Sequence, residues 1–244
     1  MVNVKGRWAL LTGASRGIGY QIALFMAKQG CNLILQSRDS KHSEDILQKV
    51  QGLGVEAYAV ACDLYDMDSV ERMLDEIEKR QTVVDIILNN AGMQVAYRED
   101  YFNTPIEDYD KSMRINFYSL TVICKRLMPK MIERGFGRVV NTSSGIADLP
   151  EMEDYAVSKA AVDKYTRDLA SKLQGTDVII SLTDPDWCRT DLGGPDAPNT
   201  PESTIPGIVV GAFVDDKISG RMFRAQEFKG MELEEAVKKA HDIR

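Results

Sequence analysis

The sequence predicts an α/β protein with a single doubly wound parallel sheet of about seven strands and helices on both faces. Short apolar runs alternate along the chain with segments whose apolar residues recur every three or four positions, as in successive β-α-β units. A glycine-rich turn, Thr12–Gly19, joins the first apolar run to the first helical segment. No repeat or low-complexity tract interrupts the chain, so residues 1–244 are expected to form one domain.

The strands are predicted from short apolar runs that glycine or polar residues bound on either side. Runs of this length with few polar residues are typical of parallel strands that are buried on both faces. In chain order, the expected strands are 8–11, 32–36, 56–61, 84–88, 137–142, 178–183 and 220–224.

The helices are predicted from apolar residues at spacings of three and four. The first is expected to begin at Gly17 and end at Gly30, and the second to end at Gly52, because glycine readily closes a helix. A kink is expected where Pro129 interrupts a long helical pattern, and the charged last helix is expected to be peripheral. The remaining expected helices are 66–79, 105–133, 154–173 and 232–240.

Composition and charge exclude several classes of function. Of the 244 residues 44% are hydrophobic and 27% are charged, and the net charge of −7 argues against nucleic acid or an anionic membrane as a partner. No apolar run approaches the ~18 residues that cross a bilayer, and the N-terminus lacks the apolar region of a signal peptide. The four cysteines are scattered and the two histidines isolated, so we expect free thiols in the cytoplasm and no metal site.

The glycine-rich turn is expected to bind phosphate. Its glycines allow the backbone to approach a pyrophosphate, and free N–H groups at the start of the following helix attract the negative charge. The alternative is a tight turn with a structural role alone. The residues expected to line this cradle are Gly13, Ser15, Arg16, Gly17, Ile18 and Gly19.

The end of the second strand distinguishes between dinucleotide cofactors. Sheets that bind NAD usually carry a carboxylate there, which binds the ribose 2′-hydroxyl. Here Ser37 and Arg38 follow the strand, and Arg38, together with Arg16, is expected to pair with a 2′-phosphate. Two solvated arginines, with Asp39 as the cap of the next helix, are the alternative. The sequence therefore predicts NADP(H) as the cofactor.

Two further strand ends are expected to contact the cofactor. Asp63 and Leu64 follow the third strand and would meet the adenine, although a helix-entry role for Asp63 is an equal alternative. Asn90, Ala91 and Gly92 follow the fourth strand, where small residues allow the cofactor's ribose to approach the backbone closely.

A candidate acid–base pair lies in the second half of the chain. Tyr155 and Lys159 are four positions apart in a predicted helix and therefore share one face. A free tyrosine has a pKa of about 10, and a nearby ammonium stabilises its phenolate and brings the pKa towards neutrality. Ser143 and Ser144 end the fifth strand, and Asn116 is a polar residue on an apolar helical face, a pattern that by itself favours a structural amide.

In their order and intervals, these motifs resemble the short-chain dehydrogenase/reductase family over practically the whole chain. The resemblance implies a Rossmann-like form of the sheet. It implies that Tyr155 protonates the substrate's carbonyl oxygen as hydride arrives, and that Lys159 lowers the pKa of Tyr155 and holds the nicotinamide ribose. Of Ser143 and Ser144, the second is the one that family members with a double serine usually use to hydrogen-bond the substrate oxygen. Asn116 would hold a water in the proton relay behind Lys159.

The sequence departs from the family in two places. The interval between Ser144 and Tyr155 is short, so the connecting loop is expected to be trimmed. Asp186 also stands where the family has glycine ahead of the nicotinamide. Aspartate tolerates the left-handed backbone region, so the turn is expected to survive. Its carboxylate would lie close to the cofactor, or turn to solvent or to Arg189.

The loop that follows is expected to select the substrate. Residues 186–206 are rich in glycine, proline, asparagine and serine, which is typical of a loop with little helix. By the family resemblance, Pro185 and Thr190 would contact the cofactor.

The expected function is NADPH-dependent reduction of a small ketone or aldehyde to an alcohol by a cytoplasmic enzyme. A 3-oxoacyl-acyl-carrier-protein reductase is the alternative enzyme. A non-catalytic dinucleotide-binding regulator is a third hypothesis, but such a protein would be expected to lack Tyr155 or Lys159. Helices 105–133 and 154–173 carry more apolar surface than one sheet face covers, so a homodimer or homotetramer is expected.

Overall fold

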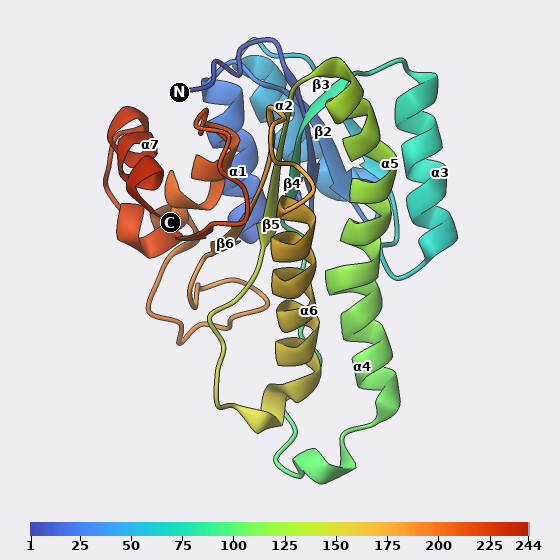
Figure 1. The fold of residues 1–244 in the computed structure, drawn as a ribbon. Coiled ribbons are helices and arrows are strands. Elements are labelled where there is room, and N and C mark those ends of the chain that lie inside the picture. Colours follow the sequence, from blue (N-terminus) through green and yellow to red (C-terminus); the bar gives the residue numbers. More distant parts are fainter. Residues whose placement is uncertain (244) are drawn as a thin grey trace.

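A computed structural model describes residues 1–243, with a seven-stranded sheet at its centre (Figure 1). All neighbouring strands are parallel, in the order β3-β2-β1-β4-β5-β6-β7, which confirms the predicted doubly wound sheet. The strands are β1 (Trp8–Thr12), β2 (Asn32–Ser37), β3 (Ala57–Ala61), β4 (Val84–Asn89), β5 (Gly137–Thr142), β6 (Val178–Asp184) and β7 (Met222–Arg224). The α-helices are α1 (Gly17–Lys28), α2 (Glu44–Gly52), α3 (Met67–Lys79), α4 (Ile106–Met113), α5 (Ser119–Arg134), α6 (Glu153–Ala170) and α7 (Leu233–Asp242).

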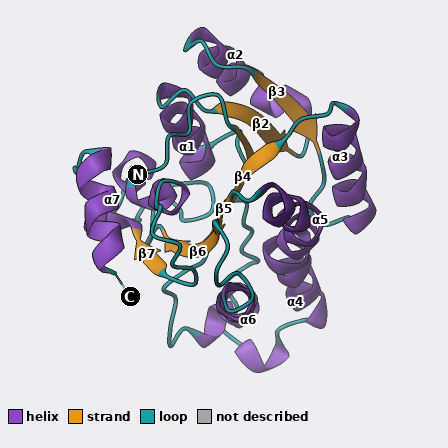
Figure 2. Ribbon diagram, turned by 45° about the horizontal axis from the view of Figure 1, so that its top comes forward, coloured by secondary structure: helices purple, strands orange, loops and turns teal. Residues whose placement is uncertain are grey.

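The sheet is buried on both faces, as its first strand illustrates. Along β1, Ala9 and Leu11 point into one hydrophobic cluster and Leu10 into the other, because side chains alternate between the faces of a strand. Helices α1, α2 and α7 cover one face, and α3, α5 and α6 cover the other (Figure 1 and Figure 2). This two-sided burial explains why the strands are near-continuous apolar runs in the sequence.

The strand order reverses beside β1. This strand pairs with β2 on one side and with β4 on the other. In such sheets, the connections on the two sides of the reversal leave a crevice at the carboxyl ends of the strands. Because β1 ends at Thr12 and β4 ends at Asn89, the glycine-rich turn and the segment after β4 lie together at this crevice.

The predicted helix 105–133 contains an irregular turn that the sequence did not indicate. A π-helical segment, Arg114–Tyr118, joins α4 to α5, and α5 continues through Pro129. A π-helical turn accommodates an additional residue, so it changes the direction of the side chains around it, and such turns are frequent at functional sites. This segment carries Asn116, which is buried.

Helix α7 is not peripheral, which corrects the prediction made from its charged sequence. Ala236, Val237 and Ala240 are buried and belong to the main hydrophobic cluster. Their spacing gives the helix one narrow apolar face, which packs on the buried segment Gly207–Ala212. The charged residues that dominate the sequence of α7 occupy the remaining surface of the helix.

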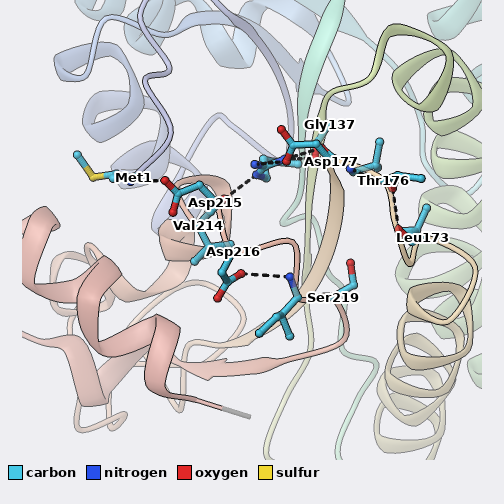
Figure 3. A network of polar contacts seen from close by, with 12 residues as sticks. Met1, Gly137, Leu173, Thr176, Asp177, Val214, Asp215, Asp216 and Ser219 are labelled. Carbon is cyan, nitrogen blue, oxygen red and sulfur yellow. Dashed lines mark hydrogen bonds and ion pairs between the residues drawn. The ribbon is translucent and has the colours of Figure 1, made fainter.

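A network of polar contacts around the buried Arg138 lies at the edge of the sheet opposite the crevice (Figure 3). Arg138 in β5 is 1% exposed, and its guanidinium donates to the Asp177 carboxylate and to the Val214 carbonyl, each at 2.8 Å. Desolvation lowers the pKa of Arg138, and Asp177 acts in the opposite direction. The N-terminal ammonium of Met1 pairs with Asp215 at 2.6 Å. The network ties the starts of β5 and β6 to both terminal regions of the chain.

Candidate active site

The glycine-rich turn is too closely packed for larger residues. A Cβ at Gly19 would overlap the carbonyl oxygen of Gly13, and a Cβ at Gly13 would lie 3.0 Å from the Cα of Ala91. Arg16 begins α1 without a side-chain cap, and the first helical turn has no acidic residue. No acidic residue of α1 itself therefore competes for the N–H groups at the start of the helix. The tight turn and the open helix end form a cradle that fits a pyrophosphate.

Asn90 fastens the end of β4 to the cradle. Its Nδ2 donates to the Thr12 carbonyl at 3.1 Å, and the N–H groups of Asn90 and Ala91 each donate to Thr12 Oγ1 at 3.1 Å. At Gly92, an added Cβ would lie 3.5 Å from the Nζ atom of Lys159. The predicted residues after β4 therefore lie between the cradle and the lysine.

At the end of β2, some side chains form hydrogen bonds within the protein and one is accessible to a ligand. Gln36, which the sequence reasoning missed, accepts a hydrogen bond from Gly13 N at 2.9 Å and so supports the cradle. The Ser37 hydroxyl is buried and donates to the Asp39 carbonyl at 2.7 Å, and the cofactor contact predicted for Ser37 stays a prediction. The Asp39 carboxylate caps the short helical turn that follows. Arg38 is exposed, and its guanidinium is accessible to a ligand.

The loop after β6 touches the cradle directly. Arg16 forms an ion pair with Asp191, whose Oδ2 lies 2.8 Å from Arg16 Nη1. A Cβ at Gly17 would lie 3.1 Å from Thr190 Cγ2. The structure therefore places Thr190 at the cradle, and it gives Arg16 a protein partner that the sequence did not indicate. Other predicted cofactor contacts that are half-buried in this region are Ser15, Ile18 and Pro185.

The two residues predicted to meet the adenine differ in their surroundings. Leu64 is buried in the hydrophobic core, whereas Asp63 is exposed and its carboxylate accepts a hydrogen bond from Tyr65 N at 3.0 Å. Helix α3 begins later and is capped by Asp66, which accepts from Asp68 N at 3.0 Å. The helix-entry role therefore falls to Asp66, and Asp63 remains accessible at the end of β3.

Tyr155 and Lys159 lie one turn apart on α6 and are both buried. The Lys159 Nζ atom donates to the Thr142 carbonyl at 2.8 Å and lies 5.6 Å from the centre of the Tyr155 ring. Burial raises the pKa of Tyr155 to about 12, while hydrogen bonding with Ser144 acts in the opposite direction. Burial also lowers the pKa of Lys159 to about 8. The phenol is therefore protonated at neutral pH and lies beside Ser144.

The structure separates the two serines at the end of β5. Ser143 is buried, and its hydroxyl donates to the carboxylate of Asp163 on α6. Ser144 is half-buried, lines a cavity of ≈ 350 Å³ and accepts a hydrogen bond from Ile146 N at 3.2 Å. Ser144 therefore borders this cavity, which Tyr155 does not line, whereas Ser143 holds the strand end against the helix.

Asn116 braces the helix that carries Tyr155. Its Oδ1 accepts from Met93 N at 2.8 Å, and its Nδ2 donates to Met93 O at 2.8 Å and to Ser158 Oγ at 2.9 Å. Ser158 in turn donates to the Tyr155 carbonyl at 2.7 Å. Both amide hydrogens of Asn116 are thus used to join the segment after β4 to α6. The water-holding role implied by the family resemblance stays a prediction.

Asp184, the last residue of β6, is a carboxylate of the site that the sequence reasoning missed. It lines the same cavity as Ser144. Its negative charge adds to the raised pKa of Tyr155 and opposes the lowering of the Lys159 pKa. The one sequence signal for Asp184 is its place directly before the Pro-Asp pair at which the family pattern is broken.

Asp186 adopts the left-handed conformation that the family's glycine would provide. Its φ is +62°, and its backbone N–H donates to the Asp184 carboxylate at 2.9 Å. Its own carboxylate accepts hydrogen bonds from Trp187 N at 2.7 Å and from Asn199 Nδ2 at 3.3 Å. The side chain thus turns into the loop towards Asn199, and not towards Arg189.

Other features of residues 1–243 bear on the expected functions. No group of three or more His, Cys, Asp or Glu in this part of the chain is placed to hold a metal ion. The four cysteines are free and buried. None of the described helices is long and apolar enough to cross a membrane. A second cavity of ≈ 480 Å³ lies between the end of α6 and the segment before β7, and none of the predicted site residues lines it.

The fold and the site together define a dinucleotide-binding α/β protein. A phosphate cradle lies at the reversal point of a parallel sheet, and a tyrosine, a lysine and a serine meet at the same edge. The short chain dehydrogenase family matches residues 7–200. The chain belongs to the short-chain dehydrogenase/reductase family and is an oxidoreductase of that NAD(P)-using family.

Several known proteins are similar to the chain. It is 30% identical over 195 residues to a fatty acyl-CoA reductase of Acinetobacter baylyi, covering 79% of this chain and 66% of that protein. The match thus spans just under two thirds of that relative. It is 33% identical over 212 residues to the oxidoreductase UcpA of Salmonella typhimurium, covering 84% of this chain and 80% of that protein. A solved metagenomic short-chain oxidoreductase in complex with NADP is 26% identical, with a TM-score of 0.71, covering 75% of this chain and 84% of that chain.

Proposed function

We propose that the protein is an NADPH-dependent reductase that converts a small ketone or aldehyde to an alcohol. The observation that carries the proposal is the buried phenol of Tyr155, which lies beside Ser144 at the edge of the sheet where the phosphate cradle opens. NADPH, when bound, supplies the hydride. A relative named as an acyl-CoA reductase and a structural neighbour in complex with NADP support this proposal. The buried free cysteines favour a reducing, cytoplasmic location.

Each residue of the site has its own part in this reaction. Ser144 donates a hydrogen bond to the carbonyl oxygen of the substrate and stabilises the negative charge that develops there. Tyr155 gives its phenolic proton to the same oxygen. Lys159, as an ammonium beside the resulting phenolate, stabilises that anion and holds the ribose of the cofactor. Asn116 keeps Tyr155 in position through its bracing of α6.

The electrostatics of Tyr155 keep its hydroxyl in the neutral form that carries the proton. A phenol with a pKa of about 12 is almost wholly protonated at neutral pH and can act as an acid. Oxidation of an alcohol requires the phenolate as a base, and the negative charge of Asp184 disfavours that form. Asp184 therefore keeps the proton on Tyr155 and acts against the phenolate that Lys159 would stabilise.

NADPH is expected to bind at least about tenfold more tightly than NADH, because Arg38 is accessible and no acidic residue stands in its place. A charge-assisted contact contributes about 1.5–3 kcal/mol. Arg38→Ala should bring the two dissociation constants together in a calorimetric titration. Lys5→Ala, which removes an exposed positive charge ahead of β1, should leave their ratio unchanged. Equal dissociation constants in the unmodified protein would exclude the NADP(H) assignment.

A 3-oxoacyl-acyl-carrier-protein reductase is the second candidate, and the similarity to a relative named as an acyl-CoA reductase favours it. NADPH turnover with a panel of ketones, quinones and acyl thioesters separates the two enzymes. A clear preference for 3-oxoacyl thioesters would support the second candidate over the first. A non-catalytic regulator would bind cofactor and turn over none of these compounds.

We also expect the protein to form a homodimer or a homotetramer. On and beside the long helices, Tyr118 is 42%, Ile132 44% and Val157 45% exposed. Apolar side chains exposed on neighbouring helices favour an interface with a second copy of the chain. Light scattering at micromolar concentration should therefore give a multiple of the 27.3 kDa chain mass. A mass equal to one chain would contradict this prediction.

A further inference from the structure

The substrate loop, residues 186–206, is docked on the cofactor cradle. The carboxylate of Asp191 forms an ion pair with Arg16 at 2.8 Å, and Arg16 is the N-cap residue directly before α1. Next to this pair, the Cγ2 atom of Thr190 is 3.1 Å from where a Cβ at Gly17 would lie. The ion pair thus joins the loop to the same turn that fits the phosphates of a dinucleotide.

The loop has contacts that hold it in place independently of Asp191. Thr190 Oγ1 accepts a hydrogen bond from Gly193 N at 3.1 Å, which shapes the loop around the ion pair. Further along, Glu202 accepts from Gln21 Nε2 at 2.9 Å, which is a second polar link between the loop and α1. Removing the charge of Asp191 should therefore leave the loop docked.

Arg16 has two possible partners when a cofactor with a 2′-phosphate is bound. One is Asp191, and the other is the phosphate dianion, which a guanidinium can bind bidentately. The side chains of Arg16 and Asp191 are 75% and 74% exposed, so their ion pair is weak and exchanges readily. One guanidinium cannot make its best contacts with both anions at the same time.

We propose that Asp191 competes with the 2′-phosphate of NADP(H) for Arg16, and that it thereby limits the preference for NADP(H) over NAD(H). The inference rests on the proposed NADP(H) dependence. NAD(H) presents a hydroxyl in place of this phosphate, so Arg16 can stay with Asp191 while that cofactor is bound. Asp191 is therefore a specificity-determining residue that acts against one cofactor and is neutral towards the other.

The test uses ligands that isolate the 2′-phosphate. Isothermal titration calorimetry with 2′,5′-ADP and with 5′-AMP compares the unmodified protein with the nearly isosteric Asp191→Asn variant. We expect 2′,5′-ADP to bind about two- to fivefold more tightly to the variant, as for release of an exposed ion pair, and 5′-AMP to bind equally to both. The ratio of the NADH and NADPH dissociation constants should rise by the same factor.

Two controls separate competition from a general effect of charge. Asp196→Asn removes an exposed negative charge from the same loop, away from the contacts of the loop with Arg16 and Gln21, and should leave both affinities unchanged. In an Arg16→Ala background, Asp191→Asn should have no effect on 2′,5′-ADP, because the contested guanidinium is absent. Thermal unfolding of each variant shows whether the loop substitution has altered the fold.

Each other outcome has a definite meaning. Equal tightening of both nucleotides, or the same gain from Asp196→Asn, would indicate a general electrostatic effect and overturn the inference. Weaker binding of both nucleotides to the Asp191→Asn variant would mean that the ion pair helps to hold either cofactor. That result would also overturn the inference. If the unmodified protein binds 2′,5′-ADP no better than 5′-AMP, the NADP(H) assignment itself fails. If the unmodified protein prefers 2′,5′-ADP to 5′-AMP and Asp191→Asn leaves that preference unchanged, only the inference about Asp191 is rejected. The NADP(H) assignment then stands.

Discussion

Replacing Tyr155 with phenylalanine is expected to lower turnover by a factor of about 10²–10⁴ and to leave NADPH affinity nearly unchanged. The substitution removes only the phenolic hydroxyl, which is the proton source for the substrate oxygen. Tyr155 as a whole is 9% exposed, and the phenylalanine ring would keep its packing. Steady-state NADPH consumption measures the first quantity, and a cofactor titration measures the second.

Tyr165→Phe is the matched control for this experiment. Tyr165 lies on the same helix, its pKa is also raised by burial, and its ring packs against Phe117 with centroids 5.9 Å apart. Its hydroxyl lies beside Cys124 and not beside Ser144, so its loss should leave turnover close to normal. Substantial turnover in the Tyr155→Phe variant would mean that another acid protonates the substrate.

Gly19→Ala is expected to weaken cofactor binding at least about tenfold. The added Cβ would overlap the Gly13 carbonyl oxygen and lie 2.8 Å from Asn90 Nδ2. Overpacking of this kind typically costs about 1–3 kcal/mol, and here the opposing atom belongs to the backbone and cannot rotate away. The cradle must therefore open. Calorimetric titration with NADPH measures the loss, and thermal unfolding should show a lower Tm.

Gly52→Ala provides the control. Gly52 is the last residue of α2, and a Cβ added there would meet nothing within 4 Å. The Gly52→Ala variant should bind NADPH as tightly as the unmodified protein does, and its stability should be unchanged or slightly increased. If Gly19→Ala binds NADPH normally, then the cofactor's phosphates do not lie at the glycine-rich turn.

The fold could be predicted in large part because its signals are local. Near-continuous apolar runs such as 84–88 and 137–142 indicate strands buried on both faces, and the structure has strands at both places. The prediction was wrong where a helix depends on its neighbours. The π-helical segment Arg114–Tyr118 has no distinct residue pattern, and α7 is charged in composition, although its narrow apolar face packs on the core.

The pairing of Tyr155 with Lys159 could also be predicted from the sequence, because residues four positions apart share one helix face whatever the rest of the fold. The different roles of Ser143 and Ser144 could not be predicted from the residues themselves, since neighbouring residues of the same type differ only in what surrounds them. Asp163 takes the hydroxyl of Ser143 and leaves Ser144 at the cavity. Because Asp163 lies on α6, the packing of this helix against the end of β5 determines which serine hydroxyl is accessible.

By itself, the sequence determined the sheet, the glycine-rich turn and the tyrosine–lysine pair, because each depends on residues within a few positions of one another. Only the tertiary structure showed that Gln36 supports the cradle, that Asp184 shares the cavity of Ser144 and that Asp191 holds Arg16. These contacts join residues far apart in the chain, and the parallel sheet brings them together by placing the carboxyl ends of its strands at one edge.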